Sequence, residues 1–163
     1  MERTAAARAL QGLIEQAVIK TDRVPTGNRG QTSAPVDIFR TRDGWILTQV
    51  IGQPLFKRWA RLMGEEHWLT DARFKDDISR GNNGAVVSER MSRWCAERTC
   101  EEALAELEKA SIVAGQMYSP QQALDDDHIR VAHLIEERDY PGLAGTVPLA
   151  PTPIDLSETP GTY

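Results

Sequence analysis

The stretch from Thr26 to Ile51 constrains the fold of this chain more than any other part. A polar loop with two glycines, Gly27 to Gln31, precedes two short apolar runs that are separated by an Asp-Gly turn. An Asp-Gly pair between runs of this kind is a strong signal for a β-hairpin. We therefore expect a loop followed by a hairpin with strands near 36–40 and 45–51.

Glycines in the loop would allow its backbone to approach a ligand closely, because glycine has no side chain in the way. The same pattern also fits a plain hairpin that follows a loop without any function. The pattern alone favours this simpler interpretation, so a binding role for Gly27 to Gln31 needs other support.

Charge and composition exclude several classes of protein. The chain has 163 residues, a formal net charge of -5, and basic residues that are dispersed rather than clustered. This balance argues against nucleic acid or an anionic membrane as the main partner. No apolar run approaches the ~20 residues that a membrane-spanning helix needs, and the amphipathic N-terminus lacks the features of a secretory signal.

Two cysteines, Cys95 and Cys100, are too few for a disulfide framework. Their spacing does not match that of metal ligands, so both are interpreted as small residues of helices. We expect a reducing, cytoplasmic setting.

Helical patterns dominate the rest of the chain. Residues 4–18 carry one apolar stripe and predict a helix, and residues 24–35 read as a linker. Capping signals at Gly64, Thr99 and Ser119 mark a helix end and two helix starts. Short strands are expected near 112–118, 134–140 and 147–149. Short antiparallel strands among helices predict an α+β fold, with helices packed on a small antiparallel sheet.

Several segments in this order resemble the family III CoA-transferases (the CaiB/BaiF group), which include formyl-CoA transferase and α-methylacyl-CoA racemase. The similar segments, in chain order, are Gly27-Asn28 with Ala34-Pro35; Phe39 to Ile46; Phe56 to Leu62 with Asp71 to Phe74; Ser111 to Gln116 with Gln122 to Leu124 and Asp126-Asp127; and Pro153-Ile154 with Leu156 to Gly161. One departure is that Ile112-Val113-Ala114-Gly115 lacks the proline of the family's Gly-(Ile/Val)-Pro segment. The loop there is therefore expected to differ from that of the family.

The resemblance covers the small domain of the family and implies a specific domain organisation. Residues 1–34 would be a helix and linker from the edge of the large domain, 35–150 the small α+β domain, and 151–163 a tail returning toward the large domain. The family's catalytic aspartate and most of its CoA contacts lie in an N-terminal half to which nothing here corresponds. The resemblance thus implies a truncated small domain that is inactive alone.

The resemblance also implies a substrate site at the loop. Gly27, Asn28, Arg29, Gly30 and Gln31 would lie over an acyl-CoA, the thioester substrate of the family, and no other cofactor is implied. The planar guanidinium of Arg29 suits a carboxylate. The chain would shape a site whose catalytic residues come from a separate large-domain polypeptide. The alternative is a non-catalytic domain that binds a protein partner or has a structural role.

No residue of this chain is assigned a catalytic or metal-binding role. The cluster from Asp125 to Asp127 could supply a nucleophilic carboxylate, but acids at a helix start are favourable for purely structural reasons. His128 and His133 do not share a helix face, and His67 is expected to pack beside Trp68.

Family members form interlocked dimers. The resemblance, together with the apolar stripe of residues 4–18, leads us to expect a homodimer, because exposed stripes of this kind seldom stay unpaired. The alternative is that this helix packs back on its own small domain.

Overall fold

The computed structural model describes residues 25–152, 154 and 156–159. These residues belong to two compact units, one that ends at Met117 and one that begins at Tyr118. The expected helix at residues 4–18 lies outside the described residues. From the sequence we expect three segments, 1–34, 35–150 and 151–163, that correspond to domains of the family. The division after Met117 is based on contacts within this chain and does not test those bounds. The three segments therefore stay a prediction.

The first unit is built on a three-stranded antiparallel sheet in the order β1-β2-β3. Strands β1 (Val36–Arg40) and β2 (Trp45–Gln49) form the expected hairpin, with Phe39 opposite Ile46. Strand β3 (Ala114–Gln116) pairs with the other edge of β2. The Asp-Gly turn is closed by the Thr41 N–H, which donates to the Gly44 carbonyl over 3.0 Å.

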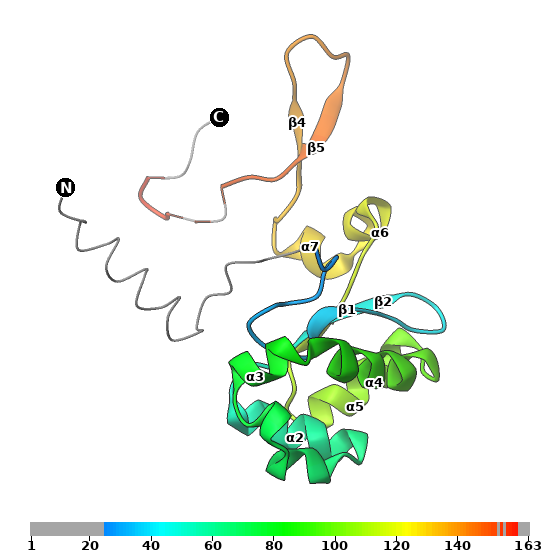
Figure 1. Ribbon diagram of the computed structural model, residues 1–163. Coiled ribbons are helices and arrows are strands. Elements are labelled where there is room, and N and C mark those ends of the chain that lie inside the picture. Colours follow the sequence, from blue (N-terminus) through cyan, green and yellow to red (C-terminus); the bar gives the residue numbers. More distant parts are fainter. Residues whose placement is uncertain (1–24, 153, 155, 160–163) are drawn as a thin grey trace, which may run out of the picture. The chain divides into compact units, whose positions relative to one another are not determined.

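Helices lie against one side of this sheet (Figure 1). They are α2 (Gln53–Met63), α3 (Asp77–Asn82), α4 (Gly84–Ala96) and α5 (Cys100–Lys109), with two 3₁₀ turns, η1 (Glu66–Thr70) and η2 (Ala72–Phe74), between α2 and α3. Gly64 ends α2 with a φ of 72°, a left-handed conformation that favours glycine. Thr99 begins α5 with a capping box that includes Glu102. Both capping expectations are confirmed.

The core of the first unit lies between the sheet and these helices. Several of its largest fully buried apolar side chains are aromatic. These large side chains are Trp59, Phe39, Phe56, Phe74, Ile46, Met91, Leu107, Val50 and Val87. Phe74 stacks on Trp68 with ring centroids 4.6 Å apart. Phe56 lies 6.3 Å from Phe74 and Trp59 lies 5.8 Å from Trp68, measured between ring centroids, so the rings join α2 to η1 and η2.

The second unit contains α6 (Pro120–Asp125), α7 (Asp127–Val131) and an antiparallel pair formed by β4 (Glu136–Asp139) and β5 (Thr146–Leu149). Ser119 caps α6 with a second capping box. None of the described residues from Tyr118 onward is buried. Large apolar side chains are instead exposed, and they are Tyr118, Leu124, Val131, Leu134, Tyr140, Leu143, Leu149, Ile154 and Leu156.

Helices together with small antiparallel sheets confirm the expected α+β class. Residues 77–84 are rich in glycine and asparagine, which are poor helix formers. The structure nevertheless has two helices that meet at Asn83, because Asp76 caps α3 by accepting from the Ser79 N–H over 2.7 Å. Among the described residues, no helix is long and apolar enough to cross a membrane.

Candidate functional site

The candidate loop, Gly27 to Gln31, leads into β1 and is held by its own hydrogen bonds. The Thr26 hydroxyl donates to the Arg29 carbonyl over 2.8 Å. The Gly30 N–H donates to the Val36 carbonyl over 2.7 Å. Gly27 has a φ of 68°, which side chains other than that of glycine rarely adopt. The loop therefore has a defined turn at Gly27 and a backbone bond to the first strand.

This loop packs against the corner between α3 and α4. At Gly81 of α3, an added Cβ atom would lie 2.4 Å from the carbonyl oxygen of Gln31. At Gly84 of α4, an added Cβ would lie 3.5 Å from the Cδ atom of Arg29, which is ordinary contact. The loop backbone thus lies directly on Gly81, and the stem of Arg29 lies beside Gly84.

A polar network ties the end of the loop to the same corner. The Ser33 hydroxyl contacts the Val50 carbonyl at 2.9 Å and the Asp77 carboxylate at 3.2 Å. The Gly52 N–H donates to both carboxylate oxygens of Asp77, each over 3.0 Å. Asp77 also pairs with Arg80, whose side chain is 1% exposed. The start of α3 therefore holds both the segment after the loop and Gly52, the residue that precedes α2.

Electrostatics keep Asp77 ionised in this network. Burial raises the pKa of its carboxyl group, but the bonds from Arg80, Gly52 and Ser33 and the charge of Arg80 outweigh burial. The net result is a pKa below the ordinary value of 3.8. The network is accordingly an ionic one near neutral pH.

The side chains that the loop offers to a ligand are polar. Asn28 is exposed, whereas Arg29 and Gln31 are half-buried. The Gln31 amide lies 3.5 Å from the Thr26 hydroxyl. No ion pair among the described residues involves Arg29. The loop therefore presents a guanidinium group and an amide, donors that fit a carboxylate or a thioester carbonyl.

The other acidic candidates have structural roles. Asp126 begins α7 by accepting from the Ile129 N–H over 2.9 Å, and Asp127 is exposed and pairs with Arg130. The bond from the Ile129 N–H, with smaller effects from Tyr118 and His128, lowers the pKa of Asp126. These contacts agree with the interpretation of Asp126 and Asp127 as a helix start. Asp125 instead ends α6, where it accepts from the Gln121 side chain over 3.0 Å.

Neither histidines nor cysteines form a reactive cluster within the described part of the chain. His67, His128 and His133 are all exposed. The His67 ring has its edge toward Trp68, but its side chain is 71% exposed, so the expectation that it packs is only partly met. Cys95 and Cys100 are unbonded and buried. In residues 25–152, 154 and 156–159, no three His, Cys, Asp or Glu side chains could hold a metal ion together.

Sequence patterns did not predict the residues that position the loop, namely Asp77, Arg80 and Gly81. The one signal was that Gly81 is unfavourable inside a helical pattern, which does not say what packs against it. The residue that packs against Gly81 is Gln31, which is far away in the sequence. The sequence therefore gave no means of pairing the two.

Relatives with known activities share most of this chain. A succinyl-CoA–D-citramalate CoA-transferase from Chloroflexus aurantiacus is 29% identical over 140 residues, which are 85% of this chain and 35% of the relative. A formyl-CoA:oxalate CoA-transferase from Bradyrhizobium diazoefficiens is 26% identical over 149 residues, 85% of this chain and 34% of the relative. The chain spans about a third of the length of these relatives.

Solved structures share the fold. Rv3272 from M. tuberculosis superposes with a TM-score of 0.64 at 20% identity, over 97% of this chain and 40% of the other. A CAIB/BAIF family protein from Brucella suis gives a TM-score of 0.64 at 20% identity, over 96% and 39% of the two chains. The sequence model of CoA-transferase family III matches residues 2–163, so this chain belongs to CoA-transferase family III.

Proposed function

We propose that this chain shapes the acyl-CoA site of a family III CoA-transferase, with the Gly27 to Gln31 loop against the substrate. The observation that carries this proposal is the family match over residues 2–163. Relatives of this chain are named as CoA-transferases for succinyl-CoA and formyl-CoA. An acyl-CoA thioester is therefore the substrate class that we propose.

The loop has suitable chemistry for such a substrate. Arg29 is half-buried, and its planar guanidinium is the kind of group that binds an anionic carboxylate or phosphate. Asn28 beside it is exposed and can donate to a carbonyl oxygen. We assign substrate-positioning roles to these two side chains, and backbone contacts to Gly27, Gly30 and Gln31.

Transfer itself is not proposed for this chain alone. The Asp125–Asp127 cluster has structural roles, and an activated nucleophile also needs a base or a charged partner that depresses its pKa within a cleft. The resemblance to the family implies that its catalytic aspartate belongs to a part of the relatives that this chain does not span. We propose that a large-domain polypeptide supplies that residue when the site is complete.

Calorimetric titration of the chain with acetyl-CoA, succinyl-CoA and free CoA tests the proposal. We expect saturable binding of the acyl-CoA esters that weakens about ten- to hundred-fold in an Arg29→Ala variant, since a charge-assisted contact contributes roughly 1.5–3 kcal/mol. Arg58→Ala is the matched control, because Arg58 is an exposed arginine of α2 outside the loop. Equal weakening in both variants, or no heat of binding at millimolar ligand, would contradict the assignment.

A second candidate function is a non-catalytic role in binding a protein. The observation that favours it is the second unit, in which no described residue is buried while nine large apolar side chains are exposed. Patches of this kind mark interaction sites on soluble proteins. A chain that binds no CoA ester but forms a stable complex through residues after Tyr118 would favour this alternative.

A homodimer and a cytoplasmic location complete the proposal. The dimer rests on the apolar stripe of residues 4–18 and on the exposed apolar side chains of the second unit. The location rests on the two unbonded cysteines. Light scattering of the chain at high concentration tests the dimer, and a monomeric mass there would overturn it.

A further inference from the structure

We infer that the Gly27–Gln31 loop is a preformed wall of its site rather than a mobile lid, and that Gly81 is the residue that positions it. This inference rests on the proposed function in one respect only, which is that the ligand beside the loop would be an acyl-CoA. The position of the loop itself is a property of the chain without any ligand.

The loop approaches α3 very closely at Gly81. An added Cβ at this residue would lie 2.4 Å from the Gln31 carbonyl oxygen, 2.8 Å from the Gln31 carbonyl carbon and 2.9 Å from the Ser33 nitrogen. Side-chain carbons do not approach other atoms so closely, and all three atoms belong to backbone that cannot rotate away. The loop can therefore occupy this place only because residue 81 is glycine.

Helix propensity gives no other reason for glycine at this position. Gly81 lies inside α3, where alanine would be the better helix former. Its φ is not among the positive values found in the described chain, so the backbone conformation does not require glycine either. The close approach of the loop is therefore the reason for glycine at this position.

The opposite side of the loop is held against β1. An added Cβ at Gly30 would lie 2.8 Å from the Cβ of Val36, and the Gly30 N–H is bonded to the Val36 carbonyl. The loop thus lies between a strand on one side and α3 on the other, with a glycine at each contact. A segment enclosed in this way needs no ligand to take its position.

The carboxylate of Asp77 fixes the exit of the loop. It contacts the Ser33 hydroxyl at 3.2 Å and the Gly52 N–H at 3.0 Å, and it pairs with the buried Arg80. Because Arg80 is buried in the core of the first unit, the anchor of the loop moves only if that core moves. Asn28 and Arg29 are consequently presented by a rigid element, which suits a preorganised binding site.

Hydrogen exchange of the ligand-free chain tests the inference directly. We expect the Gly30 amide to be protected without ligand, and we expect acetyl-CoA to change its protection by less than about two-fold. In a Gly81→Ala variant we expect exchange at Gly30 and tryptic cleavage after Arg29 to accelerate about ten-fold or more, because the loop is displaced.

Two other glycines provide matched controls. Gly84→Ala places its Cβ at an ordinary 3.5 Å from Arg29, and Gly115→Ala places it in open space. Both variants should keep the loop protection of the unmodified chain. If Gly81→Ala does not fold, Ser33→Ala decides the question, since it removes the bond to Asp77 and should also accelerate exchange at Gly30.

Three results would overturn the inference. The first is a Gly30 amide that is unprotected without ligand and becomes protected with acetyl-CoA, and the second is a Gly81→Ala variant that behaves like Gly84→Ala. The third applies if Gly81→Ala does not fold, and it is unchanged exchange at Gly30 in the Ser33→Ala variant. Failure of the proposed function gives a different result, namely no binding of CoA esters by the unmodified chain. Exchange in the ligand-free chain still decides the position of the loop in that case.

Discussion

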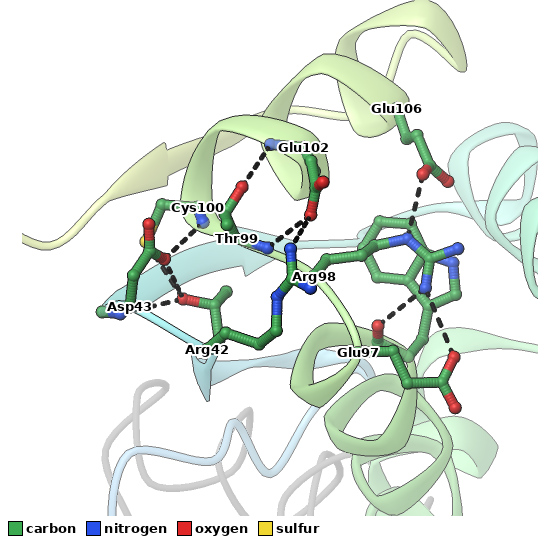
Figure 2. A network of polar contacts seen from close by, with 11 residues as sticks. Arg42, Asp43, Glu97, Arg98, Thr99, Cys100, Glu102 and Glu106 are labelled. Atoms are coloured by element: carbon green, nitrogen blue, oxygen red, sulfur yellow. Dashed lines mark hydrogen bonds and ion pairs between the residues drawn. The ribbon is translucent and has the colours of Figure 1, made fainter.

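The carboxylate of Asp43 accepts a 2.7 Å hydrogen bond from the backbone N–H of Cys100, which joins the turn of the β1–β2 hairpin to the first residue of α5. Figure 2 shows this bond beside the ion pair between Arg42 and Glu102. The Arg42 N–H also donates to the Arg98 carbonyl over 2.8 Å. The hairpin turn thus adds a second cap to α5, next to the capping box of Thr99.

The Asp43 contact leads to a first prediction. An Asp43→Ala variant should melt about 2–4 °C below the unmodified chain, because it leaves the first N–H of α5 without its acceptor. Thermal unfolding followed by circular dichroism measures the shift. Asp139→Ala is the control, since Asp139 is an exposed acid of β4. Equal melting temperatures for the two variants would contradict the capping role of Asp43.

Local signals in the sequence predicted the elements that they create. Asp43-Gly44 predicted the hairpin, and Gly64 and Thr99 predicted a helix end and a helix start, because each of these signals acts within a few residues of itself. The candidate loop was likewise located from its own glycines and from the resemblance to the family.

The sequence pattern did not predict contacts between segments that are far apart in the chain. The bond from Cys100 to Asp43 spans 57 positions, and the bond from Ser33 to Asp77 spans 44. By local propensity Gly81 is only a poor helix former, whereas in the structure the backbone of the loop lies against it. Its role depends on a segment that passes over it, which local propensity does not describe.

Arg80 gives a second prediction. Its guanidinium donates to the Gln53 side chain over 2.7 Å and to the Phe74 carbonyl over 2.9 Å, and its Cζ lies 4.5 Å from the centre of the Phe56 ring. Arg80→Ala should lower the free energy of unfolding by about 3–5 kcal/mol, because it leaves these acceptors and Asp77 without their partner.

Urea unfolding of Arg80→Ala and of Arg58→Ala provides the comparison. Arg58 is exposed on α2, so its removal should change the free energy of unfolding by less than about 0.5 kcal/mol. Arg80→Lys should recover only part of the loss, because an ammonium group lacks the planar fork of the guanidinium. An Arg80→Ala variant as stable as Arg58→Ala would show that the network contributes little.

The two cysteines give a third prediction. Burial raises the pKa of the Cys95 thiol to about 12, so almost no thiolate exists near neutral pH. Cys100 is 4% exposed, and its sulfur lies 3.1 Å from the Thr41 hydroxyl. Iodoacetamide should therefore leave both residues unmodified in the native chain and label both in urea, as measured by mass spectrometry. Rapid labelling of native Cys95 would be inconsistent with its burial.

Asp77 gives a prediction about acid stability. Although burial acts to raise its pKa, the bonds to Arg80, Gly52 and Ser33 hold the pKa of the folded chain below the ordinary value of 3.8. A group whose pKa is lower in the folded state stabilises that state above its unfolded pKa, and the contribution is lost as the pH falls through the folded value. The free energy of unfolding should therefore decrease on acidification below about pH 4.

The Asp77→Asn variant separates this contribution from those of other acids whose pKa is also lowered, such as Asp43 and Asp76. It should be less stable than the unmodified chain near neutral pH, and the difference should shrink as the pH falls, because the protonated Asp77 of the unmodified chain then resembles the amide. An Asp139→Asn control should stay parallel to the unmodified chain throughout. If Asp77→Asn also ran parallel to it, then the carboxylate would not be the charged anchor of the loop and of Gly52.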